Sequence, residues 1–456
     1  MDLLRKKDIH SSFEQSETLV RCLSAFDLTL LGIGAIIGAG IFVITGVVAA
    51  THTGPAIILS YIIAGFACLF SALSYAELAT SIGGCGSAYG YVYVGFGELI
   101  AWIVGWDLLL EYSISISAVA VGWSSYFNNL LLSLNIHLPQ YLVLGPYSGG
   151  VINLFAAFII MVLCGLLIWG AKLSTQINNV IVAVKLSVIL VFIIIATMHV
   201  ETNNWVPFAP FGWAGITKGA SLIFFAYIGF DAVSTTAEEV INPQRDLPIG
   251  IIGSLLISTI LYIVVSGLLT GIVSYKVLNV ASPISYALIL IGYNTAAAII
   301  GIGAIAGLTT VMLVLFYGLS RIFFAMARDG LLPLYFSALH EKTKTPVRII
   351  ILSSVIIAFI AAFIPIGTLA ELVNVGTLVA FTMVCCGVLI LHYTKPSLPR
   401  PFKTPFMPYV PLLGILSCLY LIINLPWFTI LRFIVWFIMG LIIYFSFSYQ
   451  RSLLNK

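Results

Sequence analysis

Four glycines within nine residues interrupt a long apolar run near the start of the chain, at Gly32, Gly34, Gly38 and Gly40. Each glycine costs a continuous helix up to ~1 kcal/mol relative to alanine. A membrane-spanning segment with this spacing therefore either packs very closely on a neighbouring helix or leaves its backbone unwound. Unwound N–H and C=O groups persist at membrane depth only where they line a cavity or meet a ligand.

An unwound segment of this kind can bind both ends of a zwitterion. A helix that restarts after Gly40 has N–H groups without intrahelical partners and a partly positive end, which suit a carboxylate. The half-helix that ends near Ile36 presents unpaired carbonyl groups, which suit an ammonium group. The first segment alone leaves an alternative open, because Gly34 and Gly38 are four residues apart and could form a close packing face.

A second apolar segment carries a similar irregularity. Within residues 224–233, Gly229 and the ionisable Asp231 fall in the middle of the run. Two interrupted segments at matching positions of two chain halves indicate a substrate site in secondary transporters. A ligand with a carboxylate and an ammonium a few ångström apart is an α-amino acid, and this is the ligand that the two breaks predict.

Lys185 is the most informative ionisable residue, because it lies in the middle of the apolar segment 178–197. A charged lysine at the centre of a spanning helix costs ~2.5–3.5 kcal/mol, so such residues are functional candidates. A neutral amine avoids this cost, and Lys185 is therefore a candidate proton carrier. A structural ion pair, or an ammonium bound by backbone carbonyl groups, is the alternative.

Three further polar residues are expected to support the site. Glu111 shares a helix face with Asp107, four residues earlier. Asp231 follows the second break, and Thr309 could form a hydrogen bond across helices toward the first one. Each of the carboxyl groups could instead serve only to satisfy unwound backbone or a structural partner.

The elements that position these residues must be membrane helices. The chain has 456 residues, of which 61% are hydrophobic and 8% charged, whereas about a quarter of an ordinary soluble domain is charged. Apolar runs of about 20 residues predict an all-α polytopic membrane protein with twelve transmembrane helices. With both termini cytoplasmic, most of the 20 Lys and Arg residues fall on the inner side, as the positive-inside rule requires.

The twelve helices predict an internal repeat. Residues 25–197 and 218–392 would each hold five helices and would therefore have opposite orientations in the membrane, which is a hallmark of secondary transporters. The predicted organisation has a cytoplasmic N-terminal tail (1–24), these two inverted repeats, two further helices (408–447) and a cytoplasmic C-terminal tail (448–456).

These segments resemble the amino acid–polyamine–organocation superfamily, and within it the bacterial homologues of the cationic amino acid transporters. The matching stretches are 25–42, 224–231, 238–248 and 328–333. The resemblance implies a leucine-transporter-type 5+5 inverted repeat with broken helices 1 and 6. It also implies that a substrate carboxylate meets the N–H groups of Ala39 and Gly40, and that the ammonium meets carbonyl groups near Ile36 and between Phe225 and Ile228.

The predicted substrate-binding residues are Ile36, Ile37, Gly38, Ala39, Gly40, Phe225, Ala226, Tyr227 and Ile228. The resemblance further implies that Phe225 occludes the substrate, and that Lys185 stands where sodium-driven relatives bind their ion, which suggests proton coupling. Many relatives have a hydroxyl residue at the position of Ala39, so here the backbone would hold the carboxylate without that contact.

The sequence thus predicts a transporter of the cell membrane that imports amino acids by proton-coupled alternating access. The apolar run Val311–Phe316 offers no acidic partner for a cationic substrate and favours small or medium neutral L-amino acids. A cationic amino acid transporter, an exchanger and a non-transporting amino acid sensor are the alternatives.

Other classes of function have little support. The six histidines lie in tails, in loops or near the ends of spans, so neither an enzyme site nor a metal site is predicted. We expect no cofactor except the coupling proton, and no nucleic acid partner. The expected partners are the amino acid substrate and membrane lipid, while a small membrane-protein partner or an oligomer is left open.

Overall fold

The computed structural model describes residues 5–6, 23–82, 87–133, 136–169, 175–341 and 345–455. Within these ranges the regular structure is helical, and backbone pairing of the β type is confined to an isolated bridge between Leu23 and Val240. The all-α prediction is therefore confirmed. Most of the predicted N-terminal tail, residues 1–24, lies outside the described residues.

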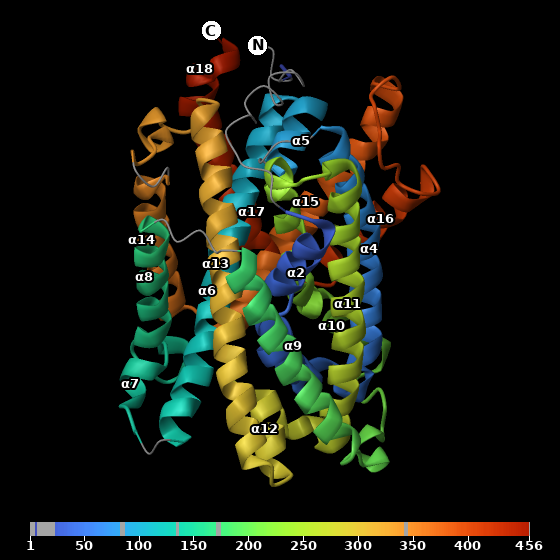
Figure 1. The fold of residues 1–456 in the computed structure, drawn as a ribbon, viewed down its shortest axis with the longest axis vertical. Helices are drawn as coiled ribbons and strands as arrows, with labels where there is room; N and C mark the ends of the chain where they lie inside the picture. The colour runs from blue at the N-terminus through green and yellow to red at the C-terminus, as the bar shows by residue number, and fades with distance from the viewer. Residues whose placement is uncertain are drawn as a thin grey trace.

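The longer helices run along the length of the molecule, with α5 and α18 at one end and α12 at the other (Figure 1). Their bounds are α2 (Ala25–Ile36), α4 (Ile57–Ser81), α5 (Ser87–Gly95), α6 (Glu98–Ser133), α8 (Leu154–Ile168), α9 (Thr175–Thr197), α10 (Gly212–Ile223), α11 (Pro243–Ile272), α12 (Pro283–Leu290), α13 (Asn294–Arg328), α14 (Val347–Phe363), α15 (Ile366–Thr394), α16 (Tyr409–Ile423), α17 (Trp427–Ile443) and α18 (Tyr449–Arg451).

Eight helical stretches in the described chain are long and apolar enough to cross a membrane, and three shorter apolar helices accompany them. The protein is therefore a multi-pass membrane protein. The first stretch, Ala25–Ser81, is 57 residues long and contains both α2 and α4. The chain turns between these helices at Gly54, where φ is +62°, a left-handed conformation that glycine adopts without strain.

The two interrupted segments lie deep inside the bundle. In the most apolar window of Ala25–Ser81, 89% of residues are buried, and in that of Gly212–Ala237 the share is 94%. The corresponding share is 17% for Trp427–Arg451, so this stretch presents most of its surface outward. The irregular backbone is thus surrounded by protein, as a membrane environment demands.

The start of α2 is tied to distant parts of the chain. Ser24 caps the helix together with Asp27 in a capping box, and the Asn179 side chain donates to Asp27 Oδ1 at 2.9 Å. The bridge from Leu23 to Val240 brings the chain two residues before α2 against the segment that follows the second break. The two irregular segments are therefore fixed relative to each other near one end.

The long helices α6 and α13 pack on each other, and α15 packs on α6. Close approach depends on small residues between them. A Cβ atom on Gly318 of α13 would lie 2.7 Å from the Tyr112 ring of α6, which is shorter than normal carbon–carbon contacts. The middle turns of both helices face the irregular segments.

Candidate functional site

The first break lies where the glycine spacing predicts it. Helix α2 ends at Ile36, and Ile37 has an extended conformation with φ −74° and ψ 98°. The chain becomes helical again around Ala39 and continues as the π-helical turn η1 (Gly40–Ile44). The last carbonyl groups of α2 and the first N–H groups of the resumed helix therefore face each other across two residues.

The second break has the same character. Helix α10 tightens into the 3₁₀ turn η6 (Phe224–Tyr227), extends at Ile228, and resumes as the 3₁₀ segment η7 (Asp231–Glu239). Gly229 has φ +123°. The Asp231 carboxylate accepts from the Gly229 N–H at 3.2 Å and from the Tyr112 hydroxyl at 2.8 Å. Asp231 therefore stabilises the unwound backbone.

The two breaks pack on each other through reciprocal glycine contacts. A Cβ atom on Gly40, in the first break, would overlap the Cα and Cβ atoms of Ala226, in the second. A Cβ atom on Gly229, in the second, would lie 2.9 Å from the carbonyl carbon of Ala35, in the last turn of α2 before the first break. Each break thus requires the absence of a side chain at one position in the other.

Tyr262 of α11 bridges the breaks from the side. Its hydroxyl lies 2.8 Å from the carbonyl oxygen of Ile36 and 2.6 Å from that of Ala226. A phenolic hydroxyl has one hydrogen, so it donates to one of these two carbonyl groups at a time. The other carbonyl oxygen then lacks this donor.

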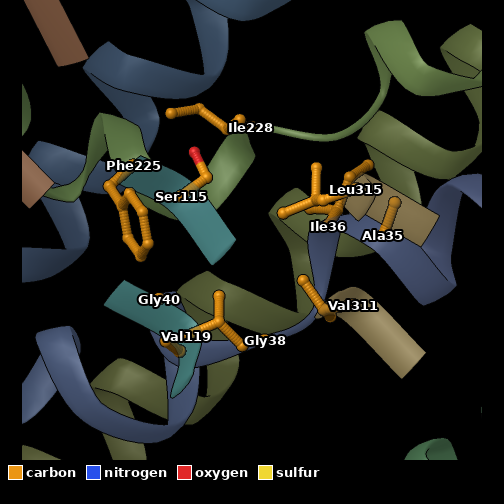
Figure 2. A pocket seen from close by; sticks show the side chains of 11 residues that line it. Ala35, Ile36, Gly38, Gly40, Ser115, Val119, Phe225, Ile228, Val311 and Leu315 are labelled. Atoms are coloured by element: carbon orange, nitrogen blue, oxygen red, sulfur yellow. The ribbon is translucent and has the colours of Figure 1, made fainter. Parts of the chain in front are cut away.

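A small cavity lies between the breaks and the middle of α6 and α13 (Figure 2). Its lining residues are Ala35, Ile36, Gly38, Ala39, Gly40, Ser115, Val119, Phe225, Ile228, Val311 and Leu315. The volume is about 10 Å³ for a water-sized sphere, which is about the room that one water molecule needs. Figure 2 shows Ser115 between Phe225 and Ile228, and its Oγ atom has no hydrogen-bond partner within the described residues.

Six of the nine predicted substrate residues line this cavity: Ile36, Gly38, Ala39, Gly40, Phe225 and Ile228. The other three do not belong to the lining. The Tyr227 hydroxyl points away and donates to the carbonyl oxygen of Tyr61 at 2.8 Å. Ala226 is covered by Gly40, and the carbonyl group of Ile37 is turned to Lys185.

Lys185 of α9 is fully buried beside the first break. Its Nζ atom donates to the carbonyl oxygens of Gly34 at 2.9 Å and Ile37 at 2.7 Å. Its stem packs on α13, where a Cβ atom on Gly307 would lie 2.7 Å from Lys185 Cε. An ammonium at the carbonyl end of α2 is favoured by the helix dipole, so any change of charge at Nζ acts directly on the break.

The prediction for Thr309 needs correction. Its hydroxyl donates to the carbonyl oxygen of Ile305 at 2.8 Å and accepts from Trp123 Nε1 at 3.0 Å. Thr309 therefore faces α6 rather than the first break, because its position on α13 lies on a different side of the helix from Val311.

The predicted supporting residue Glu111 lies on α6, and its side chain is buried, 1% exposed.

Several residues of the site were not predicted. Ser115 could have been found, because Asp107, Glu111 and Ser115 follow one another at intervals of four and so share a face of α6. Tyr262 has no such signal, since its partners lie 226 and 36 residues away.

A buried cavity between two interrupted helices, inside a bundle of apolar helices, is the arrangement of a membrane transporter. The chain belongs to the amino acid permease family, whose sequence pattern matches residues 23–449. The family resemblance seen in the sequence is therefore confirmed.

Individual relatives extend over most or all of the chain. The chain is 51% identical to the methylthioribose transporter of Bacillus subtilis strain 168, over 100% of this chain and 99% of the relative. It is 48% identical to the branched-chain amino acid permease BcaP of the same organism, again over 100% and 99%. It is 42% identical to the vacuolar cationic amino acid transporter 4 of Arabidopsis thaliana, over 87% of this chain and 68% of the relative.

Proposed function

We propose that this protein is a secondary active transporter that imports small or medium neutral amino acids across the cell membrane. The cavity between the two breaks carries this proposal. It combines unwound backbone at both breaks with an apolar wall formed by Val119, Val311 and Leu315. No charged side chain is among its lining residues, which favours a neutral substrate side chain.

The backbone supplies both recognition groups of an amino acid. The N–H groups where the helix resumes, at Ala39 and Gly40, suit the carboxylate. The carbonyl groups of Ile36 and Ala226 share the single hydrogen of Tyr262, so one acceptor is available to an ammonium. The Ser115 hydroxyl is positioned to donate to the ligand, and would replace the hydroxyl contact that Ala39 lacks.

The overall architecture proposed from the sequence fits this role. Counting Ala25–Ser81 as two crossings and adding the three shorter apolar helices brings the eight stretches to twelve. The reciprocal contacts between Gly40 and Ala226 and between Gly229 and Ala35 support equivalence of the two breaks. We propose a 5+5 inverted repeat with both termini in the cytoplasm, working by alternating access.

Proton coupling through Lys185 is part of the same proposal. The Nζ contacts with Gly34 and Ile37 link the protonation state of the amine to the shape of the first break. Loss of the proton would release both carbonyl groups from a charged donor. The cavity of about 10 Å³ is too small for an amino acid, so Phe225 or Leu315 must move when the ligand enters.

A second candidate substrate is methylthioribose, because a relative with that name is 51% identical over the whole chain. This ligand has neither a carboxylate nor an ammonium group, so it would leave the N–H groups at Ala39 and Gly40 without an anionic partner. The names of the three relatives are all those of transporters, and we propose no enzymatic activity.

A ligand screen tests the substrate class. Purified protein is heated with each of the twenty amino acids and with methylthioribose, because a ligand that binds the folded state raises its apparent stability. We expect stabilisation by neutral aliphatic amino acids. Stabilisation by arginine or lysine would refute the neutral class, and stabilisation by methylthioribose alone would refute the amino acid site. A ligand that binds without supporting counterflow in proteoliposomes would indicate a sensor.

A transport assay tests the coupling. Lys185→Ala should abolish uptake driven by a pH gradient in proteoliposomes, whereas Lys276→Ala, at an exposed position, should not change it. Unchanged pH-driven uptake by the Lys185 variant would refute the role of the lysine. Strict dependence on sodium would refute proton coupling.

A further inference from the structure

Glu98, at the first turn of α6, is a fully buried carboxylate far along the helix from the cavity. Seventeen residues separate it from Ser115 along the sequence, which corresponds to about 26 Å along a helix. Its carboxylate accepts hydrogen bonds from hydroxyl groups of three residues, Tyr93 and Tyr444 at 3.0 Å each and Ser452. The proposed transport chemistry does not use this group.

The cation that pairs with Glu98 in the described chain comes from the N-terminal segment. Arg5 donates from Nε to Glu98 Oε2 at 2.9 Å and from Nη2 to Oε1 at 2.7 Å. This two-point geometry is the strong form of a guanidinium–carboxylate contact. The Glu98 N–H also donates to the carbonyl oxygen of Arg5 at 3.0 Å, so Arg5 is held through both its main chain and its side chain.

The C-terminal segment forms the other wall of the same site. Arg5 Nη2 donates to the carbonyl oxygen of Tyr449 at 3.0 Å, and the guanidinium carbon lies 4.8 Å from the centre of the Tyr449 ring. Tyr444 and Ser452, which contact Glu98, belong to this segment as well. A guanidinium is thus enclosed by a carboxylate, a carbonyl oxygen and an aromatic face.

The same C-terminal segment is attached to the end of α13. The Leu453 N–H donates to the carbonyl oxygen of Asp329 at 3.2 Å, and Ser448 Oγ donates to that of Leu331 at 2.6 Å. The Tyr89 hydroxyl of α5 donates to Asp329 Oδ2 at 2.7 Å. The ends of α6 and α13, the two helices that form the cavity wall, are therefore joined through both chain termini.

We propose that Glu98 and the C-terminal residues around it form a receptor for Arg5, and that docking of Arg5 holds the ends of α6 and α13 together. A buried carboxylate that loses its counter-charge is strongly destabilised. Undocking of Arg5 is therefore coupled to loosening of the C-terminal segment, and through it to separation of α6 from α13. The consequence for transport depends on the proposed function, but the docking itself does not.

Hydrogen exchange on the full-length purified protein tests the docking. In Arg5→Ala, amide exchange in residues 329–332 and 448–455 should be at least tenfold faster than in the wild type, with residues 36–40 unchanged. Lys6→Ala is the matched control, since Lys6 is adjacent and exposed, and should behave as wild type. Equal exchange in the Arg5 and Lys6 variants would overturn the proposal, as would an equal increase in residues 36–40.

Two further variants guard against a simple folding defect. Arg5→Lys keeps the charge but loses the two-point geometry, so its exchange should fall between wild type and Arg5→Ala. Glu98→Gln should reproduce the Arg5→Ala pattern, and the double variant should be no faster than either single one. Additive increases would overturn the proposal. Net uptake by Arg5→Ala should differ at least twofold from net uptake by Lys6→Ala, while ligand binding is the same in both variants. Of these measurements, uptake is the one that rests on the proposed transport of amino acids; the exchange measurements do not.

Discussion

Two glycines of the first break should differ in how the same substitution affects the stability of the protein. A Cβ atom on Gly40 would overlap the Cα atom of Ala226, which is backbone of the second break. A Cβ atom on Gly38 would lie 3.0 Å from Cγ2 of Val311, the tip of a side chain. Gly40→Ala must therefore push the two breaks apart, whereas Gly38→Ala needs only a small shift of Val311.

The expected magnitudes follow from these neighbours. Overpacking against immovable atoms costs ~1–3 kcal/mol, and separating the breaks also removes the hydroxyl bridge of Tyr262, at ~0.5–1.5 kcal/mol. Gly40→Ala should therefore lower the free energy of unfolding by about 1.5–4.5 kcal/mol. Gly38→Ala should cost about 1 kcal/mol, at the lower end of the range for overpacking, but its methyl group would occupy a cavity of only about 10 Å³.

Thermal stability and uptake, measured on the same two preparations, separate these effects. Gly40→Ala should lose both, and Gly38→Ala should keep its stability while uptake falls. The double variant Gly38→Ala/Val311→Ala returns the lost space and should recover uptake. The reasoning fails if Gly40→Ala is as stable as the wild type, or if Gly38→Ala is as unstable as Gly40→Ala.

Two other side chains give sharp expectations. Without a ligand, Tyr262→Phe leaves both buried carbonyl groups unsatisfied, which is one more than in the wild type and costs ~1–3 kcal/mol, whereas a bound ammonium supplies donors to them. The variant should thus be less stable, yet a bound amino acid should raise its melting temperature more than that of the wild type; an equal or smaller rise contradicts this role. Ser115→Ala removes a hydroxyl without a described partner, so stability should stay within ~0.5 kcal/mol. If Ser115 donates to a charged ligand group, loss of ~1.5–3 kcal/mol weakens binding about 10–100-fold, and unchanged affinity would argue against that contact.

The breaks were predictable because their causes are local. The glycine spacing in Gly32–Gly40 can be recognised within the first apolar segment alone. The cost of burying Lys185 can likewise be recognised within its own apolar segment, residues 178–197. The reciprocal fit of Gly40 on Ala226 was not predictable, since it depends on how two distant segments are stacked. Thr309 was misplaced for a related reason: a sequence gives the residue spacing along a helix but not which side of the helix faces a given neighbour.

The partners of Tyr262 were beyond sequence reasoning as well. Its hydroxyl meets carbonyl oxygens of two segments that are nearly two hundred residues apart, and any residue type supplies a carbonyl group. Backbone acceptors carry no side-chain signature, so only the three-dimensional arrangement reveals them. The shared face of Asp107 and Glu111 on α6 was predictable, by contrast, because these residues repeat at the helical period, and Ser115, which was not predicted, continues the same spacing.

The single hydrogen shared by Ile36 and Ala226 has a consequence for closely related metabolites. The resting site has a surplus of one hydrogen-bond acceptor, and an α-amino acid corrects it by bringing N–H donors. The corresponding 2-oxo acid has the same carboxylate and the same side chain, but its ketone oxygen would add another acceptor against the existing surplus. A binding site that is built to form a hydrogen bond with a substrate group strongly rejects an analogue that lacks this group, because the buried polar atoms of the site are then left without a partner. The protein should therefore distinguish an amino acid from its deaminated counterpart by donor count rather than by size.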